Sequence, residues 1–344
     1  MAEDNNKTKA LHYDLLDLIK GIAAICVVFV HIRFPGNTGS IMSSFGTCGV
    51  TIFFLVSGYF IYDPGNDRKK MCDRILKRVG RNMIITLIAM VLYFLYTYNE
   101  RRMYGGLSDW LTEFTDPITY IRMMFPGDFA VISGEHLWFM ASLLFAYLII
   151  WLFIQFKIEG KIKYMLPVLM CIRIGLELYT SSFGTHWLIC SNALVAALPV
   201  MALGYVIAEK KKEAFEMTSS KLGILVIISV ALMIASSVIR IGTFDLSPIF
   251  KMMTAVTVFM FCIDHPDCHP PRALTVIGAK DALYIYIIHY MMIDPIIRLV
   301  HKIPASPIPG EWLVPILVAV FAVIAAMIIR IVSDLAGSLI KKRG

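Results

Sequence analysis

The sequence lacks the short motifs that mark several large enzyme classes. It contains no Walker loop, no Rossmann glycine pattern, no His-Glu-x-x-His zinc motif and no Gly-x-Ser-x-Gly nucleophile elbow. These absences remove the usual support for a P-loop NTPase, a dinucleotide-dependent oxidoreductase, a zinc protease or an α/β-hydrolase. No nucleic-acid-binding module is present, so the net charge of +7 is not evidence for a nucleic-acid partner.

The sequence also has few charged residues and no alternation of polar and apolar residues. Only 17% of the residues are charged, 58% are hydrophobic, and the mean hydropathy is +0.71. Non-alternating apolar runs exclude a β-barrel, and each run must satisfy its own backbone polar groups as a helix. We therefore predict an all-α, polytopic integral membrane protein with about ten transmembrane helices. The runs are 15–33, 45–62, 83–98, 136–154, 164–180, 187–208, 222–240, 248–263, 281–300 and 312–333.

Lysine and arginine set the orientation in the membrane. With the N-terminus inside, the inner segments hold 21 of these residues and the outer segments hold seven. The positive-inside rule then predicts that both termini are cytosolic. No cleavable signal peptide is expected, because the first apolar run is of full length and carries ionisable residues. The longest outer segment, 99–135, is too short for a separate enzyme domain, so residues 1–344 are predicted to form one transmembrane domain.

The seven cysteines are scattered and do not form a disulfide framework. A group of metal-binding residue types occurs between Cys262 and His269. Its spacing does not match a common zinc finger, and neighbouring prolines favour a turn. No metal is therefore expected.

The first apolar run carries polar groups on one face. Lys20 and His31 are eleven residues apart, which on a helix is about 20° around the axis and about 16 Å along it. Asp17 lies within about 60° of both. Ionisable groups inside a membrane usually face a protein interior or a water-filled path. His31 could act as a general base or pack by hydrogen bonding, and Lys20 could reach the headgroups, pair with Asp17 or neutralise an incoming anion.

The inner segment 63–82 is the most basic part of the chain. Lys70, Arg74, Lys77, Arg78 and Arg81 follow helical spacing and so lie on one face. Such a face suits a polyphosphate, such as the diphosphate and 3′-phosphate of coenzyme A. The alternative is an interfacial helix held by anionic membrane lipids.

Other polar residues occur near the outer ends of later runs. Glu135, His136 and Trp138 begin the fourth run at the level of His31, where they could help to form an acceptor pocket. Trp138 also suits an aromatic belt at the membrane surface. His289 lies in the ninth run as a packing or pocket residue.

Two further pairs favour structural roles. Ser57 and Gly58 are small residues that allow helices to approach closely. Arg173 and Glu177 are four residues apart and are expected to neutralise each other.

Four segments together resemble the acyltransferase family 3 membrane proteins. A basic residue, ten intervening residues and a histidine form that family's opening motif, and Lys20 and His31 match it. Three later segments are similar to the family's second helix, to its fourth-helix start and to its late tyrosine-rich segment. These are Val50–Ile61, His136–Phe139 and Gly278–His289.

The resemblance implies transfer of an acyl group, often acetyl, from cytosolic acyl-CoA to a hydroxyl of an extracytoplasmic glycan. It implies essential roles for His31 and Lys20. We expect the donor to bind at the basic inner face and the protein to lie in the plasma membrane of a bacterium. The best-known form of the motif has arginine where this chain has Lys20, and lysine keeps the charge but loses the bidentate fork. The added hydrolase-like and racemase domains of some members are absent from this sequence.

A transporter or flippase is the alternative. A buried stripe of Asp17, Lys20 and His31 would also serve proton-coupled movement of a solute. The sequence has neither two-fold internal symmetry nor paired interrupted helices, which are common in transporters. A scaffold for polysaccharide assembly is a third possibility, and it predicts tolerance of substitutions at Lys20 and His31.

Overall fold

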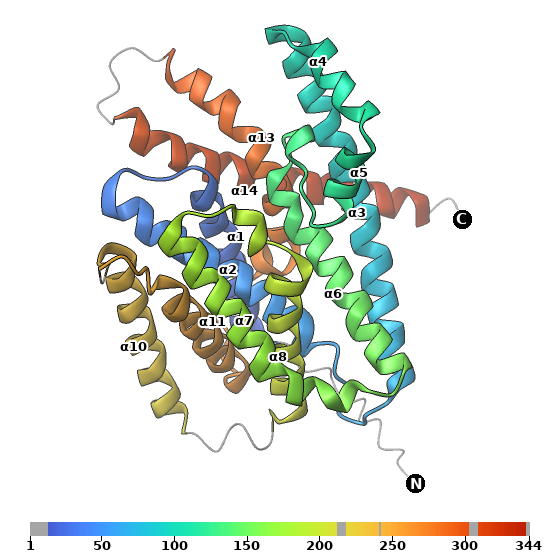
Figure 1. Ribbon diagram of the computed structural model, residues 1–344, viewed down its shortest axis with the longest axis vertical. Helices are drawn as coiled ribbons and strands as arrows, with labels where there is room; N and C mark the ends of the chain where they lie inside the picture. Colours follow the sequence, from blue (N-terminus) through green and yellow to red (C-terminus); the bar gives the residue numbers. More distant parts are fainter. Residues whose placement is uncertain (1–12, 212–217, 241, 303–308, 342–344) are drawn as a thin grey trace.

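The computed structural model describes residues 13–211, 218–240, 242–302 and 309–341, and these ranges are helical with no β-strand. Figure 1 shows the helices gathered into one bundle, with α3 and α6 side by side and α10 and α11 across the bundle from them. The α-helices are α1 (Asp14–His31), α2 (Gly36–Tyr59), α3 (Arg68–Tyr104), α4 (Leu107–Thr112), α5 (Pro117–Met124), α6 (Trp138–Gln155), α7 (Ile162–Phe183), α8 (Leu198–Glu209), α10 (Ser219–Val238), α11 (Ser247–Asp264), α12 (Arg272–Val276), α13 (Ala282–Val300) and α14 (Gly310–Lys341).

Several short helical turns connect these helices. The 3₁₀ turns are η1 (Glu113–Thr115), η2 (Ala130–Ile132), η3 (Glu135–Leu137), η4 (Glu159–Lys161) and η5 (Trp187–Ile189), and the π-helical turns are η6 (Ala193–Ala197) and η7 (Ile277–Asp281).

Seven helical segments in the described ranges are long and apolar enough to cross a membrane. They confirm an all-helical membrane protein, while the number of about ten spans and the orientation stay predictions. The first helix is outside this set because Asp14, Asp17 and Lys20 all lie within its 18 residues. Two of these residues, Asp17 and Lys20, are among those that make α1 a candidate for function.

Two predicted boundaries differ from the structure. The run 83–98 lies within α3, a helix of 37 residues that begins in the basic segment. Asp67 caps it by accepting a hydrogen bond from the Lys70 amide at 3.1 Å, so basic segment and apolar run form one rod. The run 187–208 is not one helix, because Asn192 interrupts it. Its side chain caps a new helical start by accepting from the amides of Leu194 and Val195.

Glycine allows the central helices to approach closely. At Gly58 of α2, an added Cβ would overlap the carbonyl of Met201 in α8, and at Gly204 of α8 it would overlap the carbonyl of Leu55. The two helices therefore cross backbone to backbone, which is typical of membrane helices with small residues at their contact. The packing role predicted for Gly58 is confirmed.

The π turn η7 lies directly on α1. A Cβ at Gly278 would overlap the carbonyl of Asp17, and one at Gly21 would lie 3.0 Å from the Gly278 amide. The last residue of η7, Asp281, is fully buried and pairs with Arg330 of α14 at 2.6 Å. These contacts hold the start of α13 against both α1 and α14.

The segment between α3 and α6 forms a small cap of short helices. Trp110 is only 2% exposed, and its indole N–H donates to the Val131 carbonyl at 2.6 Å. Arg122 pairs with buried Asp128 at 2.5 Å. The cap is thus internally packed and fixed to the end of α3.

Candidate functional site

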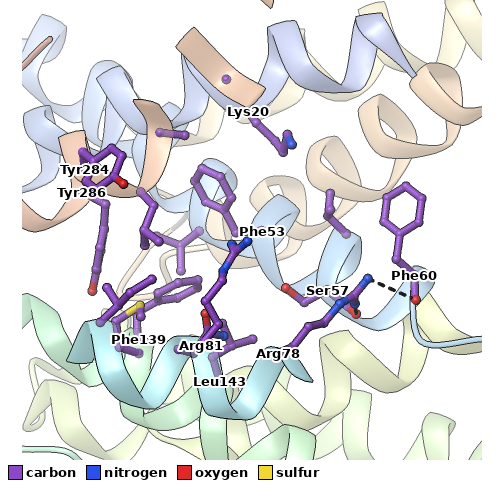
Figure 2. Close-up of a pocket in the computed structure, with 18 of the residues that line it drawn as sticks. Lys20, Phe53, Ser57, Phe60, Arg78, Arg81, Phe139, Leu143, Tyr284 and Tyr286 are labelled. Atoms are coloured by element: carbon purple, nitrogen blue, oxygen red, sulfur yellow. Dashed lines mark hydrogen bonds between the residues drawn. The ribbon is translucent and has the colours of Figure 1, made fainter. Parts of the chain in front are cut away.

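A cavity lies between α1, α2, α3, α6 and the η7–α13 segment. Its volume is about 680 Å³. Figure 2 shows Arg78, Ser57 and Phe60 at one end, Phe139 and Tyr286 at the other, and Lys20 on the opposite wall from α3. The lining combines charged groups with aromatic and aliphatic side chains from helices that are distant in sequence.

Five cations line this cavity. The cations lie on helical elements that are packed into the bundle. Lys20 also forms an ion pair with Asp17 at 2.6 Å. This confirms the i, i+3 pairing that the sequence left open, while Lys20 also faces the cavity. The five are Lys20 of α1, Lys77, Arg78 and Arg81 of α3, and Lys280 of η7.

The predicted basic face of α3 divides into two functional groups. Lys77, Arg78 and Arg81 line the cavity. Arg74 instead pairs with Asp63 at 2.7 Å and donates to the Tyr62 carbonyl at 2.9 Å. It therefore ties α3 to the segment that follows α2 and is not among the residues that line this cavity.

Arg78 and Lys70 have partners of their own. Arg78 donates to the carbonyls of Ser57 and Phe60 at 3.1 and 3.2 Å and to the Tyr147 hydroxyl at 3.3 Å. It therefore has a structural role as well as a place in the lining. Lys70 is exposed and lies 3.6 Å from Asp67.

Three imidazoles from three elements meet in the bundle beyond the Tyr286 end of the cavity. The ring of His289 lies 5.2 Å from that of His31 and 5.2 Å from that of His136, between centroids. The rings of His31 and His136 are 6.2 Å apart. This imidazole cluster (His31, His136 and His289) comes from α1, η3 and α13, and brings together three residues that sequence spacing alone could not connect.

The three histidines differ in burial and bonding. His136 and His289 are 1% and 0% exposed, whereas His31 is half-buried. The Nδ1 atom of His289 lies 3.1 Å from the Ile285 carbonyl, and its Nε2 atom has no partner among the described residues. Neither ring nitrogen of His136 makes a hydrogen bond of ordinary geometry in that part of the chain. Buried unpaired imidazole nitrogens are costly unless a ligand meets them.

Tyr286 connects the cavity to the imidazole cluster. Its side chain lines the cavity, its hydroxyl donates to the His136 carbonyl, and its ring centroid is 5.3 Å from that of His136. Along α1, Lys20 and Val27 line the cavity and His31 follows one turn later. The cavity lining therefore covers about 10 Å of α1, from Lys20 to Val27, and ends about one turn before His31.

The remaining predicted residues lie around the cluster. Glu135 is exposed and accepts a hydrogen bond from Tyr290 at 2.8 Å, and the Tyr290 ring stacks on His136 at 5.2 Å. Trp138 instead packs near Phe54 at 6.4 Å, away from the imidazoles. Glu135 thus borders the cluster and Trp138 belongs to the core.

No group of three or more histidine, cysteine or acidic residues in the described ranges is arranged to hold a metal ion. In the segment after α11, His265 stacks on Phe261 at 4.2 Å, and His269 pairs with Asp14 at 2.7 Å. These imidazoles are engaged in separate contacts.

Sequence reasoning missed several residues at the site. Lys280 and Tyr286 are in the tyrosine-rich segment, Tyr290 directly follows it, and Tyr93 of α3 lies 4.9 Å from the His136 ring. The four-residue spacing of Tyr286 and Tyr290 places them on the face next to His289, which was a usable signal. The position of Tyr93 opposite that face depends on tertiary packing.

Imidazoles buried among apolar helices, beside a cavity with a cationic end, suit a membrane protein that binds an anionic ligand and moves a proton. The sequence profile of the acyltransferase 3 family, described as an acyltransferase domain, matches residues 13–331, and the chain belongs to that family. The protein is therefore a membrane acyltransferase. No curated protein and no solved structure matches the chain.

Proposed function

We propose that this acyltransferase moves an acyl group, acetyl in the simplest case, from cytosolic acyl-CoA to a hydroxyl of an extracytoplasmic glycan, in the plasma membrane of a bacterium. One observation carries the proposal. A single 680 Å³ cavity has cations at one end, and at the other a lining residue, Tyr286, whose ring abuts the imidazole cluster.

The cationic end suits the phosphates of the donor. Lys77, Arg78 and Arg81 approach from α3, and Lys280 from η7, so a polyphosphate there would meet positive charge from two elements. Charge-assisted hydrogen bonds to phosphate are among the stronger polar contacts in proteins. The positive-inside bias favours a cytosolic position for this basic end, on the side where acyl-CoA is made.

Lys20 is suited to orient the acyl-CoA donor through a single charge rather than to bind a phosphate through two parallel hydrogen bonds. It carries a compact charge where a guanidinium would offer a planar fork. Its ion pair with Asp17 offsets part of that charge and fixes its direction. Lys20 therefore provides a local cation on the wall of the cavity, between the phosphate end and His31.

His31 supplies the base. As the acceptor oxygen bonds to the thioester carbonyl carbon, His31 accepts the hydroxyl proton; as the carbon–sulfur bond breaks, His31 returns that proton to the sulfur. The products are an ester and the free thiol of coenzyme A, so atoms and charge balance. A positioned base of this kind contributes about 10²–10⁴-fold to rate.

The acceptor hydroxyl would be held next to His31. His289 offers an unpaired Nε2 atom, and Glu135 lies at the exposed edge beside Tyr290. Partial exposure of His31 gives the acceptor access, while burial of His136 and His289 excludes water from the other side of the site.

The test uses purified protein in lipid nanodiscs, with radiolabelled acetyl-CoA and glycan fragments from a bacterial envelope. We expect His31→Gln to lose at least 100-fold in acetyl transfer while acetyl-CoA still binds, because the base is lost and the donor end is intact. His186→Gln is the matched control, since that exposed histidine lies beside Trp187 and outside the cluster.

Normal transfer by folded His31→Gln would overturn the role of the base. Uptake of a solute driven by a proton gradient, with no consumption of acetyl-CoA, would instead support the transporter.

A further inference from the structure

Polar residues recur on two helix faces that meet beside the imidazole cluster. Both α3 and α13 extend to the upper end of the molecule in Figure 1. On α3 the residues are three or four apart, and on α13 they are four apart, so each set lies along one face. We call this set the polar seam: Tyr93, Tyr96, Glu100 and Tyr104 of α3, and Tyr286, Tyr290, Asp294 and Arg298 of α13.

The inner part of the seam is joined to the imidazoles. The Tyr93 hydroxyl donates to the Ile287 carbonyl of α13 at 2.7 Å. The Tyr290 ring centroid lies 5.3 Å from that of His31 and 5.2 Å from that of His136. The seam therefore begins at the place where the acceptor hydroxyl must react.

The outer part of the seam continues as paired side chains. The Tyr96 hydroxyl donates to Asp294 at 3.4 Å, a long and weak hydrogen bond. Further out, Arg298 pairs with Glu100 at 2.5 Å and lies 4.6 Å from the centre of the Tyr104 ring. Polar and aromatic groups thus follow each other from the reaction site to the end of both helices.

The polar seam and the bordering Glu135 carry a net negative charge, and Arg33 is a cation close enough to His31 to act on it electrostatically. Glu100, Asp294 and the bordering Glu135 are carboxylates, and Arg298 is the single cation among them. Asp294 and Glu135 are exposed, so their charges face an approaching molecule. Ionised carboxylates accept hydrogen bonds and repel other anions, and tyrosine rings offer flat apolar faces beside a hydroxyl.

A second observation at the inner end also points to a hydroxylated ligand. The fully buried Nε2 atom of His289 has no hydrogen-bond partner among the described residues. With Nδ1 directed to the Ile285 carbonyl, the neutral ring leaves Nε2 as an acceptor. An alcohol group that reached His31 along the seam would supply the missing donor.

We propose that the polar seam is the acceptor-binding site and that it selects an uncharged polyhydroxylated chain, a neutral glycan, over an anionic one. The inference rests on the proposed function. Tyrosine faces lie against the sugar rings, carboxylates accept the sugar hydroxyls, and Asp294 and Glu135 disfavour glycans that carry uronic acids.

The test measures binding directly, so that it does not depend on turnover. The two probes are tetragalacturonate and its carboxyl-reduced form, which have the same linkages and differ only at C6, where the first carries a carboxylate and the second a neutral hydroxymethyl group. Calorimetry with the full chain in nanodiscs compares the wild-type protein, Asp294→Lys and Glu311→Lys. Glu311 is the matched control because it is an exposed acid at the start of α14, outside the seam.

We expect the neutral tetrasaccharide to bind at least about fivefold more tightly than the acidic one, which is the effect of one close like-charge pair in water. Asp294→Lys should reduce or reverse that preference, and Glu311→Lys should leave it unchanged. Equal binding of both probes, binding of neither, or equal effects of the two substitutions would overturn the proposal.

Release of coenzyme A from acetyl-CoA in the same samples separates this proposal from the proposed function. Selective binding of the neutral probe without release of coenzyme A would support the polar seam as a glycan site and would refute the proposed acyl transfer. Release of coenzyme A with both probes, bound at equal affinity, would support the proposed acyl transfer and would refute the polar seam as a selective site.

Discussion

Three arginines one helical turn apart on α3 give a sharp test of the donor site, because the structure assigns them different partners. Arg74 contacts the segment that follows α2, Arg78 contacts the end of α2 and lines the cavity, and Arg81 lines the cavity. We would replace each by alanine in turn. If the cavity binds the donor phosphates, some of these substitutions should weaken the binding of acetyl-CoA and others should lower the stability of the protein.

The magnitudes follow from the contacts. A hydrogen bond to a charged group contributes about 1.5–3 kcal/mol when desolvated, or roughly 10- to 150-fold in binding. Arg81 is exposed before the donor binds, so solvent screening places Arg81→Ala near the lower limit, at about tenfold weaker binding of acetyl-CoA. Its effect on stability should be small.

Arg74→Ala should show the opposite pattern. It leaves the carboxylate of Asp63 buried without its 2.7 Å partner and frees the Tyr62 carbonyl, which costs about 1–3 kcal/mol of stability. Arg78→Ala should lower both affinity and stability, since it removes three hydrogen bonds within the protein and one cationic side chain of the cavity lining.

The assay pairs acetyl-CoA affinity, from titration in nanodiscs, with the midpoint of thermal unfolding. Raising the salt concentration should weaken binding to the wild-type protein more than to Arg81→Ala. Unchanged affinity in folded Arg81→Ala, or a loss of affinity in Arg74→Ala with normal stability, would refute the assignment of the cavity as the donor site.

Three further predictions concern packing, the imidazoles and a helix cap. Gly58→Ala should lower stability by about 1–3 kcal/mol because a backbone carbonyl of α8 cannot move aside, whereas Gly175→Ala, in open space on α7, should be neutral or stabilising in the same thermal melts. Tyr286→Phe should lower kcat about fivefold by releasing the His136 carbonyl from its donor, and a loss of stability at unchanged kcat would contradict this. The Lys70 amide holds the pKa of Asp67 below its ordinary value of 3.8, so the charged cap stabilises α3 above that pH and the benefit is lost as pH falls through the lowered pKa. The difference in melting midpoint between wild type and Asp67→Asn should therefore be present at pH 7 and should disappear as the pH falls through the lowered pKa of Asp67.

Local patterns were enough to predict the membrane class and much of the helical framework. The apolar run 15–33 corresponds to α1, and the spacing of Asp17 and Lys20 predicted an ion pair that is present at 2.6 Å. The i, i+4 pair of Arg173 and Glu177 is likewise confirmed at 2.8 Å. These features depend on residues within one or two helical turns, which sequence spacing specifies directly.

Features that depend on contacts between distant helices were harder to predict. Spacing placed Arg74 with Arg78 and Arg81 on one face, but the position of α2 decides that Arg74 meets Asp63. The meeting of His31 with His289 depends on how α13 packs against α1, and no local pattern contains that information.

The π turn η7 also makes the site sensitive to chain length. A π turn holds one residue more than an α turn, and successive helical residues differ by about 100° around the axis. Deletion of Ala279 would shorten η7 to an α turn and would rotate the tyrosine and histidine face of α13 relative to Gly278, which rests on α1. A one-residue deletion could thus remove His289 from the imidazole cluster while the three histidines themselves stay unchanged. In this part of the protein the number of residues is as much a determinant of activity as their identity.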